Sequence, residues 1–197
     1  MAGISMSDAH AWAQKHLVGW PQATQGLAIQ LIVKYGMPAD SSAHELAWYD
    51  NGPWKRTVLH RKEVPHNFPL PHTDVLEQTV DYRVPPQKAA LLIQYNGSLV
   101  IDRTRGELSA HCDSESHNIL TLNLAHDILR GERDVDLALT YHAQVIRGLQ
   151  THVDEPYPKK LRFKTPAPSA PTADPGEEAP LLKHLDETIV TPPDAPP

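Results

Sequence analysis

Prolines divide this chain into two unequal parts. Nine of its 19 prolines fall in the last 33 residues, 165–197. The same stretch carries six acidic side chains and a single basic one, a formal charge of −5. Such a composition buries too little apolar surface to offset the entropy lost on ordering. The sequence therefore predicts a globular domain over residues 1–164 and a disordered, Pro- and acid-rich tail over residues 165–197.

One short apolar motif interrupts the tail at residues 180–190. Its apolar side chains recur at positions i, i+1, i+4 and i+8, which share one face of a helix; they are Leu181, Leu182, Leu185 and Ile189. A helix this short is marginal alone in water, so it needs a groove to fold against. We therefore predict that these residues dock on a protein partner or on the body of the same chain. A tail without any docking role is the alternative.

The overall composition argues against several classes of protein. The chain has 18 basic and 24 acidic side chains, a formal charge of −6, whereas nucleic-acid binders are usually basic. No apolar run approaches the roughly 20 residues of a membrane span, and the N-terminus does not resemble a secretory signal. Cys112 is the single cysteine, so no intrachain disulfide can form. We therefore expect a cytoplasmic protein without a nucleic-acid partner or a membrane span.

Periodicity in the first 164 residues predicts helices near both ends and strands between them. Helices are expected over 8–18, 22–34, 86–95, 115–130 and 135–149, and strands over 45–50, 54–61, 75–84, 98–102 and 107–111. The Asn51-Gly52 pair suits a hairpin turn, and the three prolines of 64–72 predict irregular backbone there. Because the strands come as hairpins, we predict an α+β fold with an antiparallel sheet covered by the N- and C-terminal helices.

Two blocks of sequence carry a resemblance to other proteins. The first is PHNFPLPHTDVLEQ at 65–78 with DYRVP at 81–85, and the second is RTRGELSAHCD at 103–113 with Glu115 and Asn118. They resemble an uncharacterised family of small bacterial soluble proteins over roughly residues 20–163. This resemblance implies a bacterial origin, and it brings no known activity with it. Residues 34–48 are also similar to the helix-to-strand entry of small outer-membrane assembly lipoprotein domains, which implies a likeness of fold.

A histidine-rich loop is the first candidate site. His66 and His72 lie close to two acidic residues, Asp74 and Glu77. Imidazole and carboxylate groups together suit a divalent Zn, Fe or Mn ion, and the prolines between the histidines would stiffen the site. The spacing matches no HExxH-type metal motif. A Pro-rich crossover with exposed histidines is the alternative.

The only thiol is the second candidate site. Cys112 stands between His111 and His117, where a predicted strand meets a predicted helix. A helix N-terminus and a nearby imidazole favour a thiolate, and these residue types occur in nucleophilic catalysis. However, strand alternation would point His111 and Cys112 to opposite faces. In the alternative, Cys112 is a small buried apolar residue, and Asp113 or Ser114 caps the helix.

These observations leave three classes of function. The two rings of Trp48 and Trp54 flank a hairpin and would suit a small flat ligand. The loop from His66 to Glu77, or Cys112, would suit a metal-dependent or cysteine-based enzyme. Because no strong catalytic spacing occurs, we favour the third class, a non-enzymatic bacterial accessory or binding protein with a docking tail.

Overall fold

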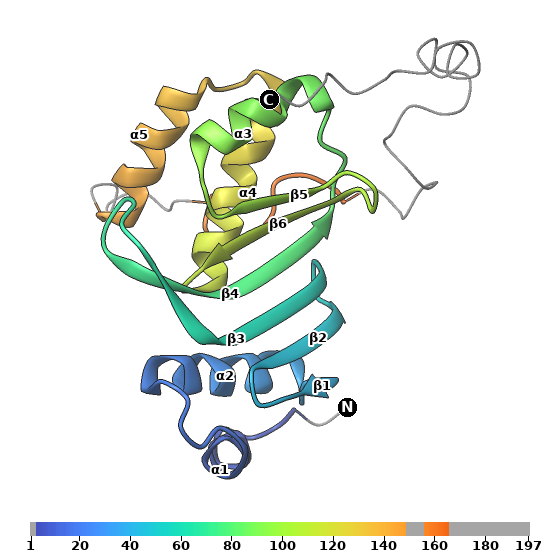
Figure 1. Ribbon diagram of the computed structural model, residues 1–197, viewed down its shortest axis with the longest axis vertical. Coiled ribbons are helices and arrows are strands. Elements are labelled where there is room, and N and C mark those ends of the chain that lie inside the picture. The colour runs from blue at the N-terminus through green and yellow to red at the C-terminus, as the bar shows by residue number, and fades with distance from the viewer. Residues whose placement is uncertain (1–2, 149–155, 166–197) are drawn as a thin grey trace, which may run out of the picture.

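The computed structural model describes residues 3–148 and 156–165 of the chain. Within these ranges it contains one six-stranded antiparallel sheet, with helices before and after the strands in the sequence. This confirms the predicted α+β class (Figure 1). The predicted tail, apart from Thr165, lies outside the described residues, as does its motif at 180–190. Within the part that is described, no helix combines the length and the apolar character that crossing a membrane requires.

Two helices come first, six strands follow with a 3₁₀ turn and a helix after the fourth, and two helices come last. They are α1 (Met6–His16), α2 (Gln22–Tyr35), β1 (Asp40–Ser41), β2 (Glu45–Asn51), β3 (Trp54–His66), β4 (His72–Asp81), a 3₁₀ turn η1 (Pro86–Lys88), α3 (Ala89–Tyr95), β5 (Leu99–Asp102), β6 (Glu107–Cys112), α4 (Glu115–Arg130) and α5 (Val135–Ile146). The strand order is β1-β2-β3-β4-β6-β5, and every neighbouring pair is antiparallel.

The strand register places the packed helices on a single face of the sheet. Leu46 pairs with Leu59, Leu59 with Leu76, and Leu76 with Cys112, so this row of side chains shares one face. At one end of the sheet α2 packs on this face and α1 packs against α2, and at the other end α4 packs on the same face (Figure 1). One sheet therefore carries two hydrophobic clusters, one beneath each group of helices.

Local signals in the sequence set the ends of α4. The Ser114 hydroxyl accepts a hydrogen bond from the backbone N–H of His117, and Gly131 ends the helix in the left-handed conformation at φ 74°. The helix therefore spans the predicted range 115–130. Helix α1 begins at Met6, two residues before the predicted start, and the Ser5 hydroxyl caps it by accepting a hydrogen bond from the backbone N–H of Asp8.

The Pro-rich segment is more regular than expected. The prediction of irregular backbone over 64–72 was wrong at both ends, because β3 continues through Pro65 to His66 and β4 begins at His72. A shift in register between Leu59 and Val64 marks an irregularity in β3, and beyond it Pro65 pairs with Thr73. Proline is tolerated at such irregular strand positions. Only residues 67–71 leave the ladder.

One carboxylate, Glu115, joins the two groups of helices. It stands in the first turn of α4 and accepts hydrogen bonds from Lys34 Nζ at 2.7 Å, Tyr35 Oη at 2.5 Å and Trp54 Nε1 at 2.9 Å. Burial alone would raise the pKa of Glu115, but the three hydrogen bonds outweigh burial and lower it. Elements α2, β3 and α4 are thus tied together at one point.

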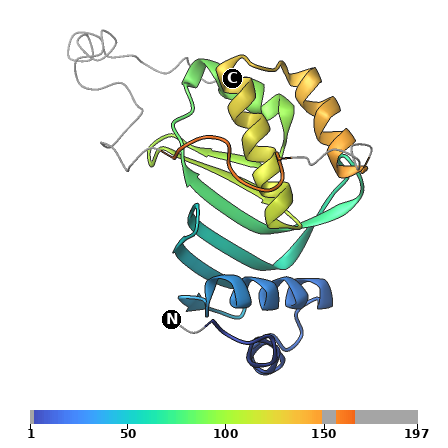
Figure 2. The same ribbon diagram turned by 180° about the vertical axis from the view of Figure 1, so that it is seen from behind.

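Residues 156–165 form a final irregular segment that lies across α4 (Figure 2). The Asn123 side chain donates to the carbonyls of Tyr157 at 2.8 Å and Lys160 at 2.9 Å, and accepts from the Arg162 N–H at 2.8 Å. The Tyr157 hydroxyl donates to the buried Asp127 at 2.7 Å. The apolar side chains of the segment pack against the core.

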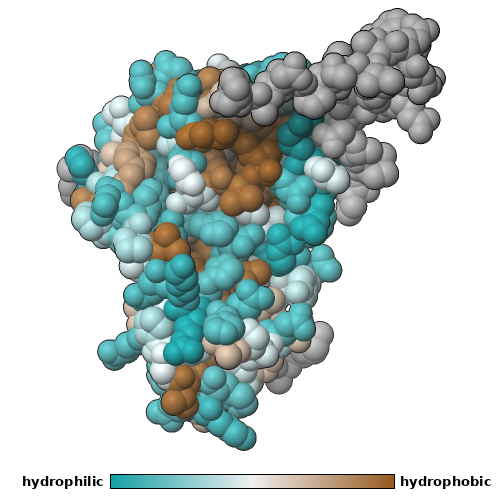
Figure 3. Space-filling model, viewed as in Figure 1, coloured by the Kyte–Doolittle hydropathy of each residue, from teal (hydrophilic) through white to brown (hydrophobic). Residues whose placement is uncertain are grey.

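Apolar side chains are also exposed beside the edge of the sheet. Figure 3 shows brown atoms over the region of α3 and β5, where Ile93 is 69% and Val100 is 49% exposed. Strand β5 has β6 as its one neighbour in the described sheet. This edge is therefore available for contact in the described part of the chain.

Candidate functional site

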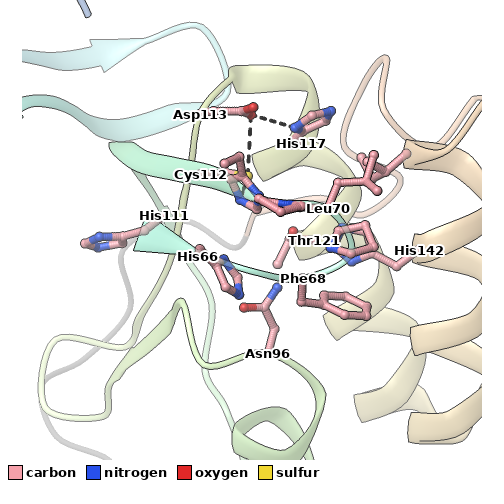
Figure 4. A pocket seen from close by; sticks show the side chains of 14 residues that line it. His66, Phe68, Leu70, Asn96, His111, Cys112, Asp113, His117, Thr121 and His142 are labelled. Atoms are coloured by element: carbon pink, nitrogen blue, oxygen red, sulfur yellow. Dashed lines mark hydrogen bonds and ion pairs between the residues drawn. The ribbon is translucent and has the colours of Figure 1, made fainter. Parts of the chain in front are cut away.

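A cavity of about 260 Å³ lies where β4 begins and β6 ends. Helices α4 and α5 contribute His117 and His142 to its wall, and the 67–71 loop contributes Phe68 and Leu70 (Figure 4). Cys112 lies at the end of β6 on the same wall. The cavity thus combines an apolar loop with several side chains of the types that bind metals in proteins.

The strand side of the cavity is built around Asp74, which is 8% exposed. Cross-strand pairing of His66 with His72 brings both imidazoles to this carboxylate. Asp74 Oδ2 accepts from Ser98 Oγ at 2.5 Å and lies 3.3 Å from His66 Nδ1. Its other oxygen, Oδ1, lies 3.1 Å from His72 Nε2 and is buried without a hydrogen-bond donor. Within the described residues, this carboxylate oxygen is therefore directed at His72 and has no other partner.

A backbone carbonyl close in the sequence orients the ring of His72. Its Nδ1 lies 2.8 Å from the carbonyl oxygen of Leu70, and because a carbonyl only accepts, the proton belongs on Nδ1. In the neutral ring the Nε2 atom then carries a lone pair. That lone pair faces Asp74 Oδ1 at 3.1 Å and Cys112 Sγ at 3.4 Å. A proton or a metal ion held between these atoms would reconcile them.

The helix side of the cavity begins at Cys112. Burial raises the pKa of the Cys112 thiol far above its usual value, and the neighbouring carboxylate of Asp113 raises it further. Asp113 Oδ1 lies 3.6 Å from the sulfur and 2.6 Å from His117 Nδ1. Burial opposes ionisation of Asp113, but the contact with His117 outweighs it and lowers the pKa to about 2. Without a cation at the sulfur, this thiol is protonated at neutral pH and is a poor nucleophile.

Together these side chains form the His72–Cys112 cluster, which we define as His66, His72, Asp74, Cys112, Asp113 and His117. They make two groups, three residues on the strand side and three on the helix side, and in each group the ligand atoms lie within 4.8 Å of one another. The groups meet at the contact of 3.4 Å between His72 Nε2 and Cys112 Sγ. Ligands bonded to zinc at 2.0–2.3 Å in a tetrahedral site are themselves roughly 3–4 Å apart. The contact therefore has the spacing of two ligands to one ion.

Outer hydrogen bonds hold three of the candidate ligands. Asp74 has Ser98, His72 has the Leu70 carbonyl, and Asp113 has His117. Metal sites commonly orient their ligands through such outer partners. The cluster thus has preformed support for a metal ion.

The structure brings together three of the four metal ligands predicted from the loop. His66, His72 and Asp74 share the cavity side, whereas Glu77 lies on the other face of the sheet. Glu77 Oε2 is 3.4 Å from His111 Nε2 and 3.5 Å from His60 Nε2, and these contacts with His111 and then His60 lower the pKa of Glu77. Positions 74 and 77 differ by an odd number, so an uninterrupted strand turns their side chains to opposite faces.

The predicted cysteine site is divided in the same way. Cys112 and His117 lie together, while the ring of His111 points away from Cys112 (Figure 4), as alternation along β6 predicts. Sequence reasoning did not include Asp113 or Ser98 among the site residues. The sequence suggests Asp113 as a helix cap and not as a ligand, and no local pattern connects Ser98 with Asp74.

The two tryptophans of the hairpin are inside the protein. Trp48 is 3% and Trp54 is 1% exposed. The Trp48 Nε1 donates to the Gly36 carbonyl at 2.9 Å, and Trp54 Nε1 donates to Glu115. Neither ring therefore offers an open face to a flat ligand. The predicted docking residues Leu181, Leu182, Leu185 and Ile189 lie outside the described residues.

No family model, curated protein or solved structure matches this chain. The likeness to a bacterial family, and with it the bacterial origin, stays a prediction.

Proposed function

We propose that this protein binds one transition-metal ion of the zinc class at the contact between His72 and Cys112. In this proposal the two residues are obligatory ligands, Asp74 binds from the strand side, and Asp113 binds from the helix side. His66 and His117 act through the two carboxylates. The protein is then a non-enzymatic binding protein whose bound component is the metal.

The orientation of the His72 ring carries this proposal. Its Nδ1 is committed to the Leu70 carbonyl, so Nε2 faces the sulfur at 3.4 Å and a buried carboxylate oxygen at 3.1 Å. A mixed set of nitrogen, sulfur and oxygen donors favours zinc, iron or copper over magnesium or calcium, which prefer oxygen alone. Binding would also convert Cys112 to the thiolate and release its proton.

A metal-dependent enzyme is the second candidate, and the adjoining cavity favours it. An ion at the His72–Cys112 contact would border about 260 Å³ of space lined in part by Phe68 and Leu70. Catalytic zinc sites keep one position open to water or substrate beside such a space.

Titration of the metal-free, full-length protein with Co²⁺ and then Zn²⁺ tests the proposal. We expect one ion per chain, a thiolate-to-cobalt charge-transfer band, and loss of at least about 100-fold in affinity in His72→Ala and Cys112→Ser. His117→Gln, which alters an outer partner, should lose roughly 10- to 100-fold. Circular dichroism of each variant shows whether the fold is retained.

His60→Ala and His111→Ala are the matched controls, because both remove an imidazole from the opposite face of the sheet. They should bind the metal with the affinity of the wild type. Absence of the charge-transfer band in the wild type, or its persistence in a folded Cys112→Ser variant, would overturn the proposal. Equal losses in the control variants would show that the metal binds elsewhere.

A further inference from the structure

A second hollow lies on the other side of α4, away from the His72–Cys112 cluster. It has a volume of about 630 Å³ and lies between the end of α2, the β2–β3 turn, the start of α4 and the final segment. We call it the lysine groove. Its apolar lining is Tyr35, Ile119, Leu161 and Phe163, and its basic lining is Lys34, Lys159, Lys160 and Lys164.

The lining of the lysine groove is strongly basic, although the body of the protein is not. Among the described residues that line it are four lysines and one carboxylate, Glu115, which is paired with Lys34 at 2.7 Å. Residues 1–164 as a whole carry 17 basic and 18 acidic side chains. Lys160 and Lys164 are exposed. The groove therefore suits a ligand that is both acidic and apolar.

We propose that the lysine groove binds residues 177–189 of the same chain. This segment combines four acidic side chains, Glu177, Glu178, Asp186 and Glu187, with the apolar set Leu181, Leu182, Leu185 and Ile189. Its one basic residue is Lys183. The acidic side chains complement the lysines, and the apolar set complements the aromatic and aliphatic lining. The proposal is independent of the metal site.

The tether between groove and segment favours this occupant over a partner in solution. Thr165 itself lines the groove, and Leu181 follows 16 residues later. A flexible linker of that length would have a root-mean-square span of roughly 20–24 Å, and a fully extended Pro-rich linker would span about 50 Å. The segment is thus held near the groove at an effective concentration on the order of millimolar. A separate protein must exceed that concentration, or bind more tightly, to displace it.

Cleavage by trypsin after Lys183 in the full-length protein tests this inference, because the scissile bond lies inside the proposed contact. A synthetic peptide of residues 176–190 serves as the unprotected reference. We expect cleavage in the intact protein to be at least about tenfold slower than in the peptide. Lys160→Glu with Lys164→Glu leaves the cleavage site unchanged and should restore most of the peptide's rate.

The matched control is Lys15→Glu with Lys62→Glu, which makes the same change of charge at exposed positions outside the groove. Its protection should stay within about twofold of wild type, since charge at a distance is screened. Three results would each overturn the inference. They are peptide-like cleavage in the wild type, full protection in the groove variant, and protection that rises with protein concentration, which would place the segment on a second copy.

Discussion

Replacing Glu115 with glutamine tests whether one carboxylate fastens the two groups of helices together. The substitution keeps the size of the side chain and removes its charge. In the wild type the carboxylate accepts from Lys34, Tyr35 and Trp54 at 2.7, 2.5 and 2.9 Å. A glutamine has one acceptor oxygen, so its NH₂ group must face a donor.

The expected loss is about 2 kcal/mol of unfolding free energy. The Lys34 side chain is 56% exposed, so its ion pair contributes little. Tyr35 and Trp54 both donate to Oε1, so a glutamine oxygen in that place keeps both bonds. Each bond then falls from about 1.5–3 kcal/mol with a charged acceptor to about 0.5–1.5 kcal/mol with a neutral one, a loss of about 1 kcal/mol per bond. With a urea m-value of about 2 kcal/mol/M for a protein of this size, the midpoint of unfolding should fall by about 1 M.

The unfolding free energy lost in Glu115→Gln should also depend on pH, and the loss should become smaller as the pH falls. The pKa of Glu115 is lowered in the folded protein. Its stabilisation is therefore present above the unfolded value of about 4.3 and is lost as the pH falls through the folded value. The gap between wild type and Glu115→Gln should be widest near neutrality and should narrow below about pH 4.

Urea titrations at several pH values measure both quantities, with Glu132→Gln as the control. Glu132 is 58% exposed and lies 3.8 Å from Arg130, so its replacement should cost less than about 0.5 kcal/mol. Equal midpoints for the two variants at pH 7, or a Glu115→Gln gap that stays constant down to acid pH, would refute the reasoning.

Two further substitutions test other parts of the fold. Asp127→Asn weakens the buried acceptor of the Tyr157 hydroxyl and should cost about 1–3 kcal/mol in urea unfolding; a smaller loss would mean that the final segment is held by its other contacts. Gly52 has φ +68°, and an added Cβ would lie 3.2 Å from a ring carbon of Tyr35, so Gly52→Ala should lower stability by about 1 kcal/mol or more. In Gly97→Ala the added Cβ meets nothing within 4 Å, so thermal melting of that variant provides the comparison, and equal melting temperatures would contradict the prediction.

The fold was predictable where short-range signals decide the structure. The cap at Ser114 and the glycine at 131 fix α4 from within its own sequence. The Asn51-Gly52 pair likewise leads from β2 into β3. Grouping strands into hairpins then limits the sheet to antiparallel arrangements. These features need no knowledge of distant residues.

The candidate site was predictable only in part, because distant strands assemble it. His72 and Cys112 are 40 residues apart, and they meet because β4 pairs with β6. The sequence predicts a strand only from residue 75, so the alternation of side chains along the strand does not include Asp74 and cannot separate it from Glu77. Beginning β4 at His72 would have separated the two acids by face.

The route of the chain through the sheet divides the His72–Cys112 cluster between two parts of the chain. A single cut in the 67–71 loop would leave α1, α2 and β1–β3 in one continuous piece and the later elements in another. Most of each hydrophobic cluster would stay with one piece, but Trp54 of β3 belongs to the cluster of the second piece, and Val75 and Leu76 of β4 belong to the cluster of the first. The seam between the pieces is the β3–β4 ladder.

His66 belongs to the first piece, and Cys112 belongs to the second. The four proposed ligands all belong to the second piece, so a bound ion would reach His66 only through Asp74, which lies 3.3 Å from the His66 ring. Two carboxylates of the second piece, Asp74 and Glu115, thus contact the first piece at opposite ends of the β3–β4 ladder.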